Sequence, residues 1–171
     1  MKFIYTWCMP NHWTFRMKPI KRFIEKELWK AKTVLIPFAG EVRYQQHPNI
    51  IYIDIEPGLP LPYTQGDSFQ VLPQFVQEQK KFDLILSDPP YTSFQAIHTY
   101  HNEQLQDITF LKECYDKLLV PNGVIIHFGF NSSGMGKSRY YKKEELLVVN
   151  LGGSHNDIIV LKERKTQTTL V

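Results

Sequence analysis

Short apolar segments alternate with amphipathic ones along this chain, and that alternation limits the folds it can adopt. Strands are predicted where the apolar runs are short, and helices where apolar residues recur every three or four positions. Strands that alternate with helices predict a parallel sheet covered on both faces, which is an α/β fold. The predicted strands are 33–38, 50–54, 82–87, 124–128, 146–151 and 157–163, and the predicted helices are 19–30, 68–79 and 105–119.

The last two predicted strands are expected to differ from the others. They enclose Gly152-Gly153, which is typical of a tight turn between antiparallel strands. A second turn is predicted at Pro121-Asn122-Gly123, before the strand 124–128. Since 171 residues with 43% hydrophobic content suit one core, the whole chain, 1–171, is predicted to be a single domain.

Composition excludes several classes of protein. Cys8 and Cys114 lie far apart, without metal-ligand or redox spacing, so a reduced, cytoplasmic protein is predicted. No apolar run approaches membrane-spanning length, and the first residues lack a signal-peptide pattern, so no membrane association is expected. The six histidines show no ligand spacing, and no metal is expected.

The segment Asp88-Pro89-Pro90-Tyr91 follows a predicted buried strand, and ligands of α/β sheets bind at the carboxyl ends of strands. The amine of adenine or cytosine is a weak nucleophile because its lone pair is delocalised into the ring. Acceptors for both of its N–H groups would let the nitrogen pyramidalise, and Asp88 and the Pro89 carbonyl could supply them from a backbone that the prolines hold rigid. Tyr91 would stack on the extruded base. The alternative is a turn in which Asp88 caps the next helix.

With this acid-Pro-Pro-aromatic motif the chain resembles the amino-group nucleic-acid methyltransferases that use S-adenosylmethionine. It is most similar to the small phage-like adenine-specific DNA methyltransferases, through the stretches 11–20, 128–137 and 152–157. The resemblance implies a Rossmann-like class I fold, with a mostly parallel seven-stranded sheet and an antiparallel C-terminal hairpin. It also implies transfer of a methyl group to N6 of adenine, with DNA a better match than RNA.

The resemblance further implies a set of cofactor-binding residues. The loop after the first predicted strand would lie under the methionine part, Asp54 would accept the ribose hydroxyls, and Asp67 would meet the adenine amine. The N-terminal segment would lie over the carboxylate. The complete set is Trp13, Thr14, Phe15, Lys18, Pro37, Phe38, Ala39, Gly40, Asp54, Ile55, Asp67, Ser68 and Ser87.

Each of these assignments has a structural alternative. Trp13 and Phe15 could be core aromatics, and Asp67 could be the N-cap of the helix 68–79. The first loop departs from the family pattern, which usually has an acid where Ile36 stands and a second glycine where Val42 stands. A catalytically degenerate nucleic-acid-binding subunit therefore remains an alternative to an enzyme.

A basic stretch with interleaved aromatics is predicted to contact nucleic acid, since such residues suit phosphates and unstacked bases. The alternative is a solvated loop. No separate target-recognition domain is expected, so sequence readout is predicted to come from loops or from a second subunit, in a homodimer or with another partner. The residues predicted to contact nucleic acid are Asn131, Lys137, Arg139, Tyr140, Lys142 and Lys143.

Two other functions fit parts of the sequence. Gly134-Met135-Gly136-Lys137-Ser138 ends like the phosphate-binding loop of a nucleotide hydrolase. The leading glycine of that pattern falls on Asn131, and the acid-tipped strand that ends at Asp88 precedes the loop when it should follow it. An RNA base methyltransferase, acting on adenine N6 or guanine N2, is the second alternative, because such enzymes share a similar motif.

Overall fold

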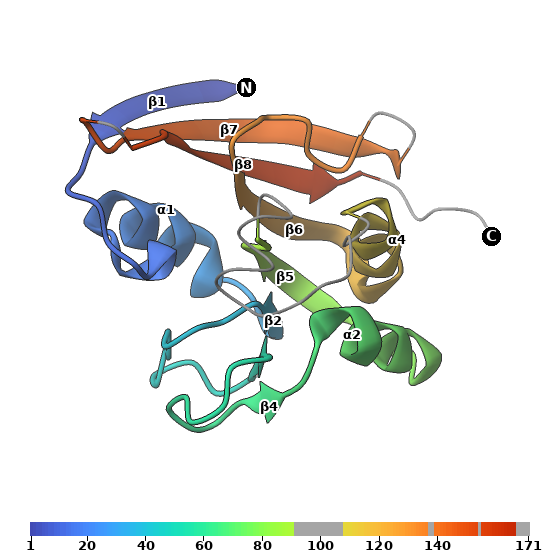
Figure 1. Ribbon diagram of the computed structural model, residues 1–171. Coiled ribbons are helices and arrows are strands. Elements are labelled where there is room, and N and C mark those ends of the chain that lie inside the picture. Colours follow the sequence, from blue (N-terminus) through green and yellow to red (C-terminus); the bar gives the residue numbers. More distant parts are fainter. Residues whose placement is uncertain (91–107, 137–138, 154, 167–171) are drawn as a thin grey trace.

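The computed structural model describes residues 1–90, 108–136, 139–153 and 155–166. Its strands form one sheet in the order β1-β7-β8-β6-β5-β2-β3-β4 (Figure 1). The strands are β1 (Lys2–Trp7), β2 (Val34–Pro37), β3 (Ile50–Asp54), β4 (Thr64–Gln65), β5 (Phe82–Ser87), β6 (Leu119–Gly129), β7 (Tyr141–Asn150) and β8 (Ile158–Lys165). The helices are α1 (Lys18–Leu28), α2 (Ser68–Gln77) and α4 (Ile108–Leu118), with a short 3-10 helix η1 (Thr14–Arg16).

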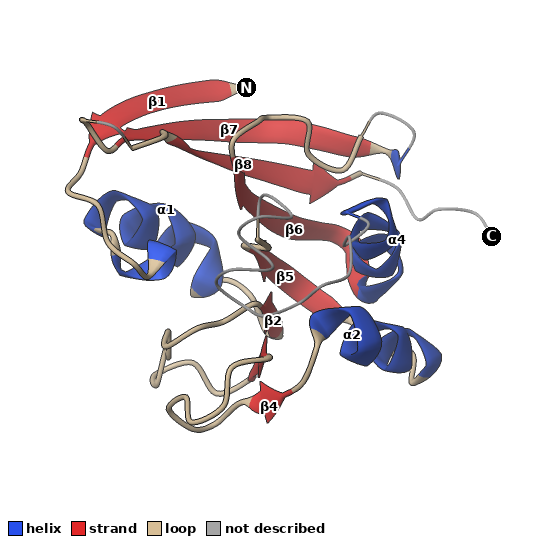
Figure 2. Cartoon of the chain, in the orientation of Figure 1, coloured by secondary structure: helices blue, strands red, loops and turns tan. Residues whose placement is uncertain are grey.

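The predicted α/β architecture is confirmed. Every neighbouring pair of strands is parallel except the two pairs that involve β8, which runs antiparallel to both β6 and β7. Helices lie on either side of the sheet (Figure 2). The structure therefore has the mostly parallel sheet and the antiparallel C-terminal hairpin expected from the sequence.

The predicted number of seven strands is wrong, because the described sheet has eight. The segment 2–7 was not predicted as a strand, yet it pairs in parallel with β7 from Lys2 to Trp7. Its composition does indicate a strand, since Phe, Ile, Tyr, Thr and Trp are residues that favour strands. The two-residue β4, at the other edge, is too short for a periodic pattern to reveal it.

Three local predictions change in detail. The predicted turn 121–123 lies within β6, as an irregularity at which the pairing with β5 jumps from Leu119 to Val124. The hairpin connection is longer than Gly152-Gly153, since β7 ends at 150 and β8 begins at 158. Helix α2 runs through Pro73 without a break.

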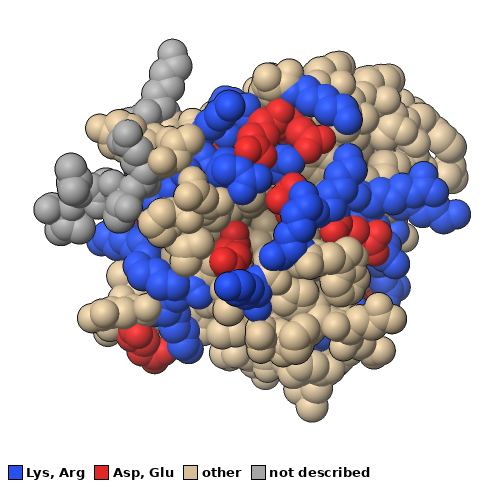
Figure 3. Space-filling view, turned by 180° about the vertical axis from the view of Figure 1, so that it is seen from behind, with Lys and Arg blue, Asp and Glu red and all other residues tan. Residues whose placement is uncertain are grey.

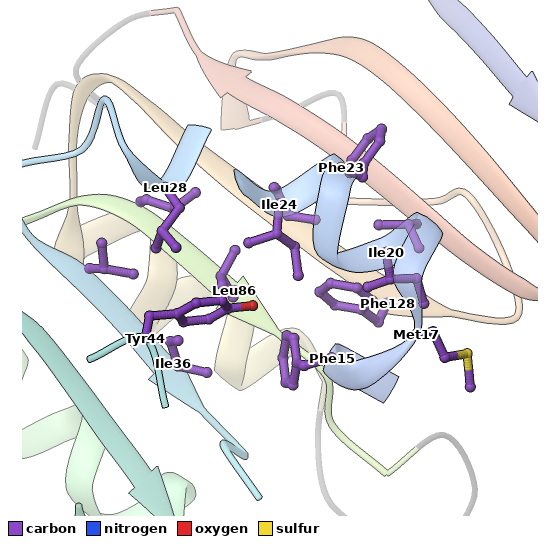
Figure 4. Packing of buried hydrophobic residues seen from close by; sticks show 14 of the residues in the cluster. Phe15, Met17, Ile20, Phe23, Ile24, Leu28, Ile36, Tyr44, Leu86 and Phe128 are labelled. Carbon is purple, nitrogen blue, oxygen red and sulfur yellow. The ribbon is translucent and has the colours of Figure 1, made fainter. Parts of the chain in front are cut away.

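The core lies on both faces of the sheet. Helix α1 covers one face because Ile20, Phe23, Ile24 and Leu28 fall on one side of it, and Pro19 suits its first turn. Figure 4 shows Ile20, Ile24 and Leu28 on the side of α1 that faces the sheet, and Ile36, Leu86 and Phe128 belong to the same cluster. On the other face, α2 and α4 pack against Leu35, Ile85 and Ile125. These two layers hold β2, β5 and β6 in place at the centre.

A group of charged residues, buried or half-buried, joins the C-terminal hairpin to α1. Lys162 on β8 has a side chain only 8% exposed, and its Nζ lies 3.2 Å from Glu27 Oε1, 3.3 Å from Glu144 Oε2 and 2.5 Å from Glu145 Oε1. Arg164 also contacts Glu144, at 2.6 Å. Acidic and basic side chains lie interspersed in the upper half of Figure 3. We call Glu27, Glu144, Glu145, Lys162 and Arg164 the hairpin ion cluster.

Candidate active site

The carboxyl ends of the parallel strands β2, β3, β5 and β6 lie at one edge of the sheet. Three of these strands end in residues predicted to be functional. They are the loop after Pro37, Asp54 at the end of β3 and the segment after Ser87. Parallel sheets bind ligands at this edge. The fold therefore gathers residues that lie far apart in the sequence into one candidate site.

Asp54 joins the first two of these strands. Its Oδ2 accepts a hydrogen bond from the Gly40 N–H at 2.7 Å, and its Oδ1 accepts one from the Glu56 N–H at 2.9 Å. The Ala39 N–H donates to the carbonyl of Ile53 at 2.9 Å, which extends the pairing of the two chains into the loop. Asp54 is buried, whereas Ile55 is 40% exposed. The carboxylate thus fixes the loop 38–40 against the end of β3.

The loop after β2 takes an unusual backbone path. Phe38 has φ +65° and Gly40 has φ +52°, both in the left-handed region. Ala39, between them, is buried, as is Pro37 before them. Since a non-glycine residue seldom adopts positive φ, the strain at Phe38 marks this loop as a place that the surrounding structure over-determines.

The N-terminal segment, which the resemblance places over the carboxylate of the cofactor, lies over this loop. A Cβ at Gly40 would come within 2.5 Å of the Trp13 ring, so the ring lies directly on the glycine. Arg16 forms a salt bridge with Glu41, at 2.6 Å. Thr14 is half-buried and Lys18 is exposed. Phe15 has the structural role that was left open, because it is buried against Phe128 with ring centroids 5.1 Å apart.

Replacing Gly40 with alanine is expected to destabilise the protein by about 2–4 kcal/mol, because the new methyl group meets both left-handed strain and the Trp13 ring. Gly58→Ala is the matched control, since Gly58 also has positive φ but has no atom within 4 Å of its Cβ position. It should cost only about 1–2 kcal/mol. Urea denaturation measures both changes, and equal losses would contradict the contact with Trp13.

Asp67 and Ser68 stand at the start of α2. Asp67 Oδ1 accepts from the Phe69 N–H at 2.9 Å, which is the N-cap geometry considered as an alternative from the sequence. Ser68 is buried, and its Oγ has no hydrogen-bond partner within the part of the chain that is described. Phe69 lies between Phe38 and Phe110, with ring centroids 6.4 and 6.3 Å away. The start of α2 therefore places aromatic rings and a hydroxyl without a hydrogen-bond partner in adjacent residues.

Asp88, Pro89 and Pro90 are half-buried at the end of β5. Tyr91, the aromatic residue of the motif, lies outside the described residues. Ser87, just before the motif, donates its hydroxyl hydrogen to Tyr115 Oη at 2.9 Å inside the core, so its side chain is already engaged. Burial raises the pKa of Tyr115, which keeps the phenol neutral in this contact. Only the backbone of Ser87 is therefore placed to contact a ligand.

A cavity of about 150 Å³ opens beside this motif. Pro89 and Pro90 form one side of it, and Lys112 and Tyr115 of α4 form another. The remaining wall comes from the carboxyl end of β6 and the loop that follows it, which contribute His127, Phe128, Gly129, Phe130, Asn131, Ser133 and Gly134. The motif and the loop 131–134 therefore line the same space, although more than forty positions separate them in the sequence.

Sequence reasoning missed a charged group at this cavity. Glu163 of β8 is 1% exposed, and its Oε2 lies 3.3 Å from His127 Nε2. Burial lowers the pKa of Lys112, and Arg139 lowers it further while Glu163 opposes this effect. A single acid between Lys162 and Arg164 was the available signal, but the sequence gives no hint that it meets a histidine from another strand.

The loop 131–136 is held by residues that the sequence assigned to nucleic acid. Asn131 Oδ1 accepts from the Ser133 N–H at 2.9 Å, Arg139 donates to the Met135 carbonyl at 3.1 Å, and Lys143 donates to the Ser132 carbonyl. Lys142 and Tyr140 are exposed. Lys137 lies outside the described residues. Arg139 and Lys143 thus shape the loop, while Tyr140 and Lys142 face solvent.

The same loop does not favour the nucleotide-hydrolase alternative. The Met135 N–H donates to buried Glu163 Oε2 at 2.7 Å, and Gly134 leaves room for that carboxylate. A phosphate-binding loop needs free N–H groups directed at an anion, with no competing negative charge. Here a carboxylate already takes one of these N–H groups and would repel a phosphate.

The described residues contain no group of three His, Cys, Asp or Glu side chains arranged to hold a metal ion. None of their helices is long and apolar enough to cross a membrane.

The fold matches known methyltransferases. No protein-family model and no curated protein matches the sequence. Among solved structures, TrmN from Thermus thermophilus has a TM-score of 0.60 at 17% identity, over 89% of this chain and 51% of TrmN. A Streptococcus mutans protein provisionally described as an S-adenosylmethionine-dependent methyltransferase has a TM-score of 0.60 at 15% identity, over 84% of this chain and 48% of that protein.

The N-methyltransferase NodS from Bradyrhizobium japonicum WM9, solved with S-adenosyl-L-homocysteine, has a TM-score of 0.55 at 13% identity. That match covers 92% of this chain and 94% of NodS. The chain therefore spans about half the length of TrmN and of the Streptococcus mutans protein, and nearly all of NodS. It has the Rossmann-like fold of these methyltransferases.

Proposed function

We propose that this protein is an S-adenosylmethionine-dependent methyltransferase that modifies the exocyclic amine of a base in nucleic acid. The observation that carries the proposal is the position of Asp88-Pro89-Pro90. The segment follows a central parallel strand, borders a cavity and belongs to a fold found in N-methyltransferases. It presents a carboxylate and a rigid backbone where a parallel sheet binds its ligands.

The residues at the ends of β2 and β3 fit the cofactor. Each oxygen of Asp54 accepts one backbone N–H, so acceptor positions remain on the carboxylate for ribose hydroxyls. The buried Ser68 hydroxyl offers a polar contact beside the Phe38 and Phe69 rings, which suit a purine face. Bound S-adenosylmethionine would supply a methyl group already activated by its sulfonium, which leaves alignment of the acceptor to the protein.

Asp88 and Pro89 are proposed to align that acceptor. The Asp88 carboxylate and the Pro89 carbonyl would accept the two N–H groups of the amine, which directs its lone pair at the methyl group. The two prolines fix the backbone, so this geometry exists before the substrate binds. Holding two reactants in line contributes up to roughly 7–11 kcal/mol in favourable cases. Tyr91 is proposed to stack on the base.

We propose N6 of adenine in DNA as the acceptor. Support comes from aspartate as the first motif residue and from the sequence resemblance over 128–137 and 152–157. The exposed Lys142 and Tyr140 suit a phosphate and an unstacked base. Adenine or guanine in RNA is the alternative acceptor, and a catalytically degenerate binding subunit is the alternative without chemistry.

The test supplies isotope-labelled S-adenosylmethionine and separate pools of DNA and RNA to the purified protein. Both pools are digested to nucleosides, and mass spectrometry identifies the labelled one. Labelled N6-methyladenine from DNA is the expected result. Label found only in RNA would show that RNA, and not DNA, is the substrate. Cofactor binding without any transfer would indicate a binding subunit, and ATP binding without S-adenosylmethionine binding would overturn the proposal.

A further inference from the structure

Strand β1 exposes a stripe of large apolar side chains at one edge of the described sheet. Phe3, Tyr5 and Trp7 are 61%, 61% and 59% exposed and point to the same face. Met1 and Met9, just outside the two ends of β1, are also exposed, at 71% and 67%. Monomeric proteins rarely expose a contiguous apolar surface of this kind, which is typical of an interface.

The backbone of this edge is also open to pairing. Cys8, just after β1, donates its N–H to the Asn150 carbonyl at 3.0 Å. Backbone groups alternate in direction along a strand, so the even-numbered positions bond to β7, while the N–H and C=O groups of Phe3, Tyr5 and Trp7 point outward. Natural edge strands are usually protected by charges, prolines or bulges, and β1 has only Lys2.

We propose that β1 pairs antiparallel with β1 of a second copy of this chain, about a two-fold axis at Tyr5. In this register Tyr5 faces Tyr5 of the other copy, Phe3 faces Trp7 and Met1 faces Met9. Each of the three aromatic pairs joins positions whose backbone groups point outward, as an antiparallel hydrogen-bonded ladder requires.

A second copy is the occupant because the stripe is complementary to itself. An isologous interface requires the same patch on both partners, and the sequence of large side chains from Met1 to Met9 is symmetric about Tyr5. Moving the axis to Ile4 or Thr6 leaves one end of the stripe without an opposite residue. Cross-strand aromatic pairs add stability beyond the backbone ladder. Three aromatic and two methionine side chains from each copy, each losing on the order of 100 Å², give a total near the 1,000 Å² of a specific interface.

The dimer leaves both candidate sites open. Strand β1 runs parallel to β7, which is antiparallel to β8 and therefore parallel to β6 and β5. Its carboxyl end thus points to the same edge of the sheet as Asp88. In the antiparallel pair the two carboxyl ends point in opposite directions, so neither copy covers the other copy's site. Changes on β1 should therefore alter assembly without altering the binding of S-adenosyl-L-homocysteine.

The first experiment measures the oligomeric state by sedimentation equilibrium from 1 to 100 μM. The wild-type protein is expected to be a dimer, and Tyr5→Lys a monomer. Tyr5→Thr keeps a strand-forming residue without the ring and should weaken the dimer at least tenfold. Leu61→Lys is the control, because Leu61 is a lone exposed apolar residue, 80% exposed, and should leave the dimer intact. A wild-type monomer at 100 μM would overturn the proposal.

The second experiment tests the register through cysteine cross-linking in a Cys8→Ser background. Tyr5→Cys should give a covalent dimer on oxidation, because opposed Cα atoms lie about 5.5 Å apart, within disulfide range. Phe3→Cys alone should not, because its two copies would lie four positions apart, about 13 Å. The double change Phe3→Cys and Trp7→Cys should restore cross-linking. Equal cross-linking by Phe3→Cys and Tyr5→Cys, or none by Tyr5→Cys, would overturn the register.

Discussion

Replacing Asp88 with alanine is expected to abolish methyl transfer while leaving the binding of S-adenosylmethionine largely intact. The substitution removes the carboxylate that would accept an N–H of the amine and leaves the loop 38–40 and Asp54 unchanged. Loss of one preorganised hydrogen-bonding group at a reacting centre lowers kcat by about 10²–10³-fold. Transfer of label at saturating cofactor measures kcat, and calorimetric titration with S-adenosyl-L-homocysteine measures binding.

Asp54→Ala is the matched control, with the opposite pattern. It should weaken cofactor binding first, because it removes the acceptor for the ribose and releases the N–H groups of Gly40 and Glu56. Leaving a buried donor without a partner costs about 1–3 kcal/mol, so stability should fall as well. Near-normal turnover of Asp88→Ala would contradict the assigned role. Asp88→Asn decides less, because its amide oxygen still accepts a hydrogen bond.

Much of the sheet could be predicted because its central strands are buried on both faces. The bounds of β3 and β5 agree with the sequence prediction, since continuous apolar runs mark such strands. Strand β1 escaped because it continues into a polar segment without a turn and because exposed aromatics give no clear alternation of apolar and polar residues. The turn at 121–123 was found, but a local pattern cannot show that the pairing of β6 continues on both sides of it.

The candidate site was predictable where one motif carries it and hidden where tertiary contacts build it. Asp54 and Asp88 each end a strand, so their shared edge follows from the parallel order. The contact of Trp13 with Gly40 was not predicted, because the resemblance placed the N-terminal segment over the cofactor carboxylate and gave no contact with that loop. The meeting of Glu163, His127 and the Gly134 loop was not predictable, because it depends on the antiparallel placement of β8 beside β6.

The same placement of β8 creates the hairpin ion cluster, which links the antiparallel end of the sheet to α1. Lys162 of β8 contacts Glu27 of α1 as well as Glu144 and Glu145 of β7. A buried ion pair is weak evidence for stability by itself, because desolvation offsets the attraction between the charges. Removal of one member has a larger effect, because the remaining carboxylates stay shielded from solvent with fewer cationic partners.

Lys162→Ala is therefore expected to lower the free energy of unfolding by about 3 kcal/mol, at the low end for a broken buried pair because Arg164 still contacts Glu144 and Glu27. Lys26→Ala is the matched control, since Lys26 lies 3.8 Å from Glu145 but its side chain is 48% exposed. It should cost less than about 1 kcal/mol. Urea denaturation at pH 7 compares the two, and equal small losses would show that the cluster adds nothing.

The pH dependence of stability gives an independent check. The hydrogen bond from Arg164 lowers the pKa of Glu144. Burial alone would raise the pKa of Glu145, but the hydrogen bond and charge of Lys162 outweigh it and the pKa is lowered. Carboxylates with a lowered folded-state pKa contribute stability that is complete above the ordinary value of 4.5 and is lost as the pH falls below it.

Burial would also lower the pKa of Lys162, but its bonds to Glu145 and Glu27 outweigh this effect and the pKa is raised. The contribution of Lys162 is therefore complete below the ordinary value of 10.5 and is lost as the pH rises above it. Lys162→Ala should accordingly lose less stability than the wild type between pH 5 and pH 3, because Glu145 has already lost the closer of its cationic partners. Parallel acid-dependence curves for the two proteins would show that Lys162 does not set the pKa of Glu145.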